Sequence, residues 1–210
     1  MELYNTRVGR AVVFIFLGMA LSGFGLVLLR GNEDTWICQK GAWTQHGHPR
    51  ASKPKVPCPV KGERMKLSSS AIEETGELPM KYTCQGDNAS PPLTIADIPP
   101  VTRSLALTLD DPDAPNGTFH HLIVWNIAPD TKTIGENEMP MGSVVGNNSA
   151  GLTGYAAPCP PSGTHRYIFT LYALDEPLTL PAGATRAEFD AAIAQHRISE
   201  ASLTSKYTKQ

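Results

Sequence analysis

The stretch RSLALTLDDPDAPNGTFHHLIVWNI, residues 103–127, contains two apolar segments on either side of a turn rich in proline and aspartate. In the first segment leucine occupies every second position, the spacing of one face of a β-strand, and the second segment is almost entirely apolar. Pro112 and Pro115 end strand pairing because proline has no amide donor, and the Asn-Gly pair after them permits a sharp reversal. The stretch therefore predicts two buried strands, over residues 104–110 and 121–127, joined by a rigid turn.

A third strand and one helix follow later in the chain. The segment RYIFTLYALD, residues 166–175, is aromatic and β-branched and comes directly after a proline and glycine turn, so it predicts another buried strand. Thr185 and Glu188 have the spacing of a capping box, with Phe189 and Ile193 as the apolar face of the helix behind it. We therefore expect a mostly β domain with few helices over residues 62–210.

Ionisable side chains stand at the ends of these three strands. Asp111 and Asp113 leave the first strand where His121 enters the second, and His165 opens the third. The side chains can converge at one end of a sheet, where a carboxylate favours the protonated form of an imidazole. The residue types therefore indicate a compact anion site, for which phosphate is the best match.

Two other interpretations of the same residues stay open. In the first interpretation, Asp113 and Arg166 form an internal ion pair and the histidines only cap strand ends. In the second, two histidines and a carboxylate hold a metal ion. Spacing alone does not separate either interpretation from the anion site.

The overall composition gives no indication of nucleic-acid binding. The chain has 18 basic and 20 acidic side chains, and no basic block stands out. Its 18 prolines and 18 glycines are scattered between apolar segments, which is typical of a loop-rich β protein. We therefore expect no nucleic-acid partner.

The N-terminal region contains an uncharged apolar run, AVVFIFLGMALSGFGLVLL, over residues 11–29. At about 1.5 Å per helical residue, this run nearly matches the ~30 Å hydrocarbon core of a bilayer. We predict a transmembrane anchor with residues 1–10 in the cytoplasm, where Arg7 and Arg10 favour retention, and the rest of the chain outside. A cleaved signal peptide is the alternative, because ALSG at residues 20–23 provides a small-residue cleavage site.

Residues 30–61 show neither helical nor strand periodicity and are rich in polar residues and proline, so they predict a tether. Cys38 and Cys58 bracket this segment, and export of the chain permits their pairing. His46 and His48 carry little weight as metal ligands, because histidines in an unpatterned segment are usually solvated.

The motifs of the domain together resemble the phosphatidylethanolamine-binding protein family, also called Raf kinase inhibitor proteins, and most closely its bacterial and archaeal branch. The resemblance is carried by residues 103–127 and by YTCQGDNASPPLTI (82–95), GLTGYAAPCPPSGTHRYIFTLYALD (151–175) and ASLTSKY (201–207). It implies a large antiparallel sheet packed on a smaller sheet. It also implies a shallow pocket for phosphate, acetate or a phospholipid head group.

The resemblance assigns roles to individual residues. The implied ligand contacts are Asp111, His121, His165, Pro160 and Tyr167. The implied supports of the pocket are Asp113, Pro115 and Arg166, with a cis peptide bond between Ala114 and Pro115. Cys84 and Cys159 stand where exported relatives carry cysteines, which implies a second disulfide. His120 and Leu122 depart from the family pattern, and we expect the pocket wall to be less aromatic for that reason.

The function implied is that of a membrane-anchored, non-catalytic binding or regulatory module, with an inhibitor of a kinase or peptidase as one possible role. Its expected partners are a small anionic ligand or phospholipid head group, the membrane and a protein, with no cofactor and no metal. The alternative is a metal-dependent or histidine-assisted hydrolase of small phosphoesters. Against the alternative, the sequence has no G-x-S-x-G or H-E-x-x-H motif and no evident nucleophile beside the histidines.

Overall fold

The computed structural model describes residues 35–39, 42–50, 52–53 and 65–210. The predicted cytoplasmic segment and anchor, residues 1–29, lie outside these ranges. Within them, no helix has the length and apolar character needed to cross a bilayer.

The predicted tether contains a β-hairpin. Strands β1 (Thr35–Gln39) and β2 (Ala42–His46) pair antiparallel, with Trp36 opposite Gln45. The expectation of no strand in residues 30–61 was therefore wrong, because these five-residue segments are too short for their periodicity to be recognised. The pairing of Cys38 with Cys58 falls outside the described residues.

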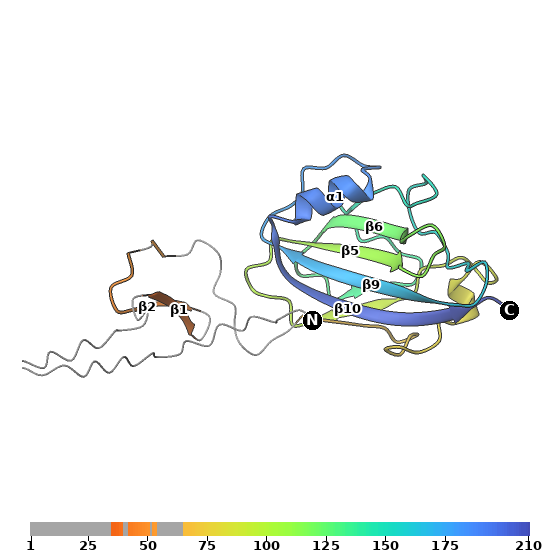
Figure 1. The fold of residues 1–210 in the computed structure, drawn as a ribbon, viewed down its shortest axis with the longest axis horizontal. Helices are drawn as coiled ribbons and strands as arrows, with labels where there is room; N and C mark the ends of the chain where they lie inside the picture. Colours follow the sequence, from red (N-terminus) through yellow and green to blue (C-terminus); the bar gives the residue numbers. More distant parts are fainter. Residues whose placement is uncertain (1–34, 40–41, 51, 54–64) are drawn as a thin grey trace, which may run out of the picture.

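The domain is built on a five-stranded antiparallel sheet with the order β10-β9-β5-β6-β8 (Figure 1). These strands are β5 (Ser104–Asp111), β6 (Phe119–Ile127), β8 (Val144–Val145), β9 (Thr164–Leu174) and β10 (Arg197–Thr208). The three strands predicted from sequence become β5, β6 and β9. Because β5 pairs with both β6 and β9, the end of β5 and the starts of β6 and β9 lie at the same end of the sheet.

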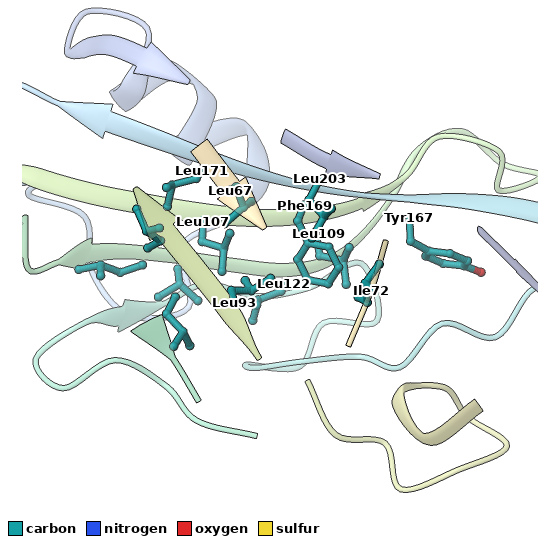
Figure 2. Close-up of a cluster of buried hydrophobic side chains, with 14 of the residues drawn as sticks. Leu67, Ile72, Leu93, Leu107, Leu109, Leu122, Tyr167, Phe169, Leu171 and Leu203 are labelled. Carbon is teal, nitrogen blue, oxygen red and sulfur yellow. The ribbon is translucent and has the colours of Figure 1, made fainter. Parts of the chain in front are cut away.

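A smaller antiparallel sheet packs on one face of the large one. It has the order β3-β4-β7, from strands β3 (Lys66–Ser68), β4 (Leu93–Ala96) and β7 (Thr133–Ile134). Figure 2 shows Leu67 and Leu93 of this sheet beside Leu107 and Leu122 of the large sheet, in one buried cluster. The expected packing of a large sheet on a smaller one is confirmed.

Among the described residues there is one α-helix, α1 (Arg186–Ile193), and it covers the opposite face of the large sheet (Figure 1). Phe189 and Ile193 are buried there against a second apolar cluster that includes Trp125 and Tyr172. The predicted capping box is present, since the Thr185 side chain accepts from the Glu188 amide and the Glu188 carboxylate accepts from the Thr185 amide. A 3₁₀ turn, η1 (Met80–Tyr82), precedes β4. The sheet is therefore buried on both faces, which explains the nearly continuous apolar character of β6.

Candidate functional site

The turn between β5 and β6 holds the first carboxylate of the site in place. Asp111, the last residue of β5, accepts a hydrogen bond from the Asp113 amide on its side-chain Oδ1, at 2.9 Å. The Gly117 amide closes the reversal by donating to the Ala114 carbonyl at 3.2 Å, with Gly117 at a φ of 96° that glycine tolerates without strain. No cis peptide bond occurs among the described residues, so the expected cis bond before Pro115 is wrong. The chain reverses at Gly117, and the peptide bond between Ala114 and Pro115 is trans.

A hollow of about 280 Å³ opens at the end of the sheet where β5, β6 and β9 meet. Four of the five residues implied as ligand contacts line it: Asp111, His121, His165 and Pro160. The remaining lining comes from Ala114, Pro115, Phe119, Ala156, Ala157, Cys159 and Pro161. The structure thus gathers side chains that are up to 54 residues apart in the sequence.

His165 is oriented by Asp111. Its Nδ1 lies 2.7 Å from Asp111 Oδ2, and both residues are buried, at 6% and 4% exposure. Because an ionised carboxylate only accepts, the hydrogen of this bond is on Nδ1. Only the Nε2 end of the His165 ring is then left to meet a ligand.

His121 is oriented by the backbone and not by a carboxylate. Its Nδ1 donates to the Ala156 carbonyl at 2.6 Å, and its ring packs against Phe119 and Tyr167 with centroids 4.6 and 5.4 Å away. His121 is 4% exposed, and its Nε2 is buried without a hydrogen-bond partner. Burial lowers the pKa of the His121 imidazole, although the Ala156 carbonyl and the Asp111 charge act in the opposite direction. His121 therefore tends to stay neutral.

Tyr167 lies behind the hollow and does not line it. The residue is fully buried, with its ring edge against His121, and its hydroxyl is buried on the side of Asp111. Burial raises the pKa of this phenol, and the charge of Asp111 raises it further. In this structure Tyr167 supports the His121 ring from behind, so a direct ligand contact would require the hollow to deepen.

Asp113 and Arg166 form a bidentate ion pair beside the hollow. The Arg166 Nε and Nη2 atoms donate to the two carboxylate oxygens at 2.8 and 2.7 Å, and the Arg166 amide adds a third bond at 2.9 Å. These hydrogen bonds lower the pKa of Asp113 to about 2. The ion pair considered from the sequence is therefore present, and it ties the β5–β6 turn to the start of β9 without occupying the hollow.

A disulfide joins the rim of the hollow to a distant turn. Cys84, just after η1, is bonded to Cys159 across 75 residues, as the resemblance implied. The Cys84 amide also donates to the Pro158 carbonyl at 3.0 Å. The segment that carries Pro160 is therefore attached to the turn at Cys84 by a disulfide and by a backbone hydrogen bond.

Three features of this region were missed from the sequence. Phe119 supplies an aromatic wall that we had not expected, whereas Leu122 points into the core. The Ala156 carbonyl that holds His121 has no side-chain signal that could have revealed it. The third feature is a second ionic cluster, on the face of the large sheet that α1 covers.

This second cluster consists of Asp110, His120, Arg186 and Asp190. Asp110 Oδ1 lies 2.7 Å from His120 Nδ1 and 2.5 Å from Arg186 Nη1. Burial alone would raise the pKa of Asp110, but the hydrogen bonds from His120 and Arg186 outweigh it and lower the pKa. The alternation of strand residues could have found this cluster, since neighbours such as Asp110 and Asp111 face opposite sides of a sheet. The cluster anchors α1 and is separate from the hollow.

The described residues give no support to the metal alternative. Within residues 35–39, 42–50, 52–53 and 65–210, no three histidine, cysteine, aspartate or glutamate side chains are placed to hold a metal ion. At the hollow, the Nδ1 atoms of both histidines are already engaged, by Ala156 and Asp111.

Comparison with known proteins relates this chain to one family. The model of the family described as phosphatidylethanolamine-binding protein matches residues 68–208. A UPF0098 protein of Methanothermobacter thermautotrophicus is 44% identical over 150 residues, which cover 69% of this chain and 99% of the relative. LppC of Mycobacterium tuberculosis, whose name describes a lipoprotein, is 39% identical over 154 residues, covering 72% of this chain and 76% of the relative.

Solved structures show the same fold. CT736 of Chlamydia trachomatis, a homologue of phosphatidylethanolamine-binding proteins, superposes with a TM-score of 0.68 at 38% identity, covering 71% of this chain and 100% of the other. Escherichia coli YbcL, described as a member of the mammalian family, gives a TM-score of 0.67 at 28% identity, covering 70% and 99%. The residues matched by the family model, 68–208, lie within the predicted domain.

Proposed function

Because the chain belongs to the phosphatidylethanolamine-binding protein family, we propose that its domain is a binding module whose hollow receives a small anion. The ligand is a phosphate group, either free or in a phospholipid head group. The observation that carries this proposal is the convergence of His121 and His165 on one hollow, each ring held by a hydrogen bond at Nδ1. Their Nε2 ends are left for a ligand, and this is how a small polar site orients what it binds.

The hollow supports binding better than catalysis. Among the described residues that line it there is no serine or threonine, and its one cysteine, Cys159, is in a disulfide. Asp111 is engaged with His165 and the turn, so it is poorly placed as a nucleophile. We therefore propose a non-catalytic role.

The Asp111–His165 pair nevertheless favours a second candidate, a histidine-assisted hydrolase. A buried carboxylate that holds an imidazole by Nδ1 is the arrangement of a general base and its orienting group. Incubation with p-nitrophenyl phosphate, with and without divalent metal ions, separates the candidates. A binding module releases no nitrophenol, whereas turnover that is lost in His165→Ala would replace the binding proposal.

We further propose that the domain lies outside the cytoplasm, attached to the membrane by residues 11–29. Two observations support this placement. The Cys84–Cys159 disulfide is chemically suited to an oxidising compartment, and one relative carries a lipoprotein name. A regulatory role as an inhibitor of a kinase or peptidase rests on the family resemblance, and it requires a protein partner that competes with the small anion.

Titration calorimetry of the full-length chain with inorganic phosphate tests the anion site. We expect His121→Ala and His165→Ala each to lose binding while thermal unfolding stays cooperative, because both residues stand at strand starts. His196→Ala is the matched control, since this histidine pairs with Asp175 outside the hollow. Parent-like phosphate binding by both hollow variants would refute the site, and tight zinc binding by the parent in that case would favour the metal alternative.

A further inference from the structure

The two histidines of the hollow offer a ligand only one nitrogen each. His121 Nδ1 points to the Ala156 carbonyl at 2.6 Å and His165 Nδ1 to the Asp111 carboxylate at 2.7 Å. Both partners are acceptors, so both Nδ1 atoms carry a hydrogen. The Nε2 atom of each ring is consequently a hydrogen-bond acceptor when the ring is neutral and a donor when the ring is protonated.

The surroundings of the two rings differ in charge. His165 is in direct contact with the carboxylate of Asp111, so its protonated form is part of a compact ion pair. His121 meets a neutral carbonyl, two aromatic rings and no direct counter-ion, and its Nε2 is buried and unpartnered. When one of the two rings carries the extra proton, the contact with the Asp111 carboxylate favours His165 as the donor and leaves His121 Nε2 as an acceptor.

Other charged groups near His121 leave that arrangement in place. From β5, Asp111 and Asp110 favour a protonated ring, and His120 on β6 itself opposes it. From β9, the Tyr167 phenol packs against the His121 ring, and the His165 ring contacts the Asp111 carboxylate. Burial is the largest influence and lowers the pKa of His121, which keeps its Nε2 lone pair free.

We propose that the hollow selects an oxyanion that still carries a proton: one oxygen accepts from His165 Nε2 and a hydroxyl donates to His121 Nε2. The inference rests on the proposed anion site and narrows its ligand class. Phosphate monoanion and the monoanions of phosphomonoesters have both groups. Sulfate and phosphodiesters, including the diester of an intact phospholipid, have no hydroxyl on the anion, so they leave the buried His121 acceptor facing another acceptor.

Three tetrahedral oxyanions that differ in hydroxyl content and charge test this selection in the full-length chain. Titration calorimetry at about pH 5.5, below the second pKa of a phosphate ester near 6, compares inorganic phosphate with sulfate and dimethyl phosphate. Dimethyl phosphate carries the same single charge as the phosphate monoanion, and sulfate carries more. Attraction by charge alone would therefore rank sulfate first, whereas we expect phosphate to bind at least about tenfold more tightly than either.

A single substitution identifies the residue responsible. In His121→Gln the side-chain amide can turn its NH₂ toward the hollow, so sulfate and dimethyl phosphate should gain relative to phosphate and the tenfold gap should shrink. His196→Gln is the matched control, because the His196 ring bonds Asp175 away from the hollow. We expect the gap to persist in that control.

The outcomes separate the two proposals. Equal affinities for the three anions in the parent would overturn the selection and leave the anion site intact, whereas binding of none of them would overturn the proposed function as well. A measurement independent of any variant is the ¹⁵N signal of His121 in the ligand-free chain at about pH 5.5. ¹⁵N chemical shifts of an unprotonated Nε2 support the inference, and ¹⁵N chemical shifts of a protonated Nε2 contradict it.

Discussion

Removal of the Cys84–Cys159 disulfide should cost the domain a large part of its stability. The bond joins residues 75 positions apart, with their Cα atoms 5.4 Å from each other. The segments that it joins also share the Cys84–Pro158 backbone hydrogen bond. In the oxidised chain the bond persists after unfolding, so it restricts the unfolded ensemble far more than the native state.

The magnitude follows from the entropy of closing the loop. For 75 residues the chain-entropy relation gives about 4.5 kcal/mol at 25 °C. For a chain of this size, each kcal/mol corresponds to about 2–4 °C, so we expect the melting temperature to fall by roughly 9–18 °C.

The assay is urea unfolding of the full-length chain and of the Cys84→Ala/Cys159→Ala double variant, followed by tryptophan fluorescence and circular dichroism. The control is Cys38→Ala/Cys58→Ala, which we expect to leave unfolding of the domain unchanged, because a bond there closes a loop within the predicted tether. A loss below about 1 kcal/mol in the first variant would refute the loop-closure reasoning and would indicate that the unfolded chain is already compact across this loop.

Further predictions concern the helix cap, the rim ion pair and the N-terminus. Thr185→Ala should lower the free energy of unfolding by about 1 kcal/mol, and Thr185→Ser, which keeps the hydroxyl, should restore most of it in the same urea titration. The pKa of Asp113 falls from 3.8 to about 2 on folding, so its stabilising effect is present above pH 3.8 and is lost as pH falls toward about 2. Asp113→Asn should therefore flatten the pH dependence of thermal stability within that window, and an unchanged slope would contradict the assignment. N-terminal sequencing of the mature protein should find Met1 or its neighbour, whereas Gly23 would replace the anchor with a cleaved signal peptide.

Local patterns in the sequence sufficed for the elements that surround the hollow. Leucine at alternate positions predicted β5, the prolines predicted its end, and the Thr185–Glu188 spacing predicted the start of α1. These features depend on residues a few positions apart, because strand alternation, the missing proline donor and helix capping are all local properties of the backbone. The β1–β2 hairpin was not predicted from the sequence, because each strand is only five residues long.

The partners of the two histidines were decided only by the tertiary structure. The sequence placed Asp111, His121 and His165 at strand ends, yet it did not reveal that Asp111 holds His165 while a backbone carbonyl of residue 156 holds His121. A carbonyl is present in every residue, so no side-chain pattern marks the one that is used. The order β9-β5-β6 places Asp111 beside the strands of both imidazoles, so the contact with His165 and the contact of His121 with the Ala156 carbonyl depend on the packed positions of the side chains and of the segment that carries Ala156. These relations join residues 35 and 54 positions apart and exist only once the sheet has formed.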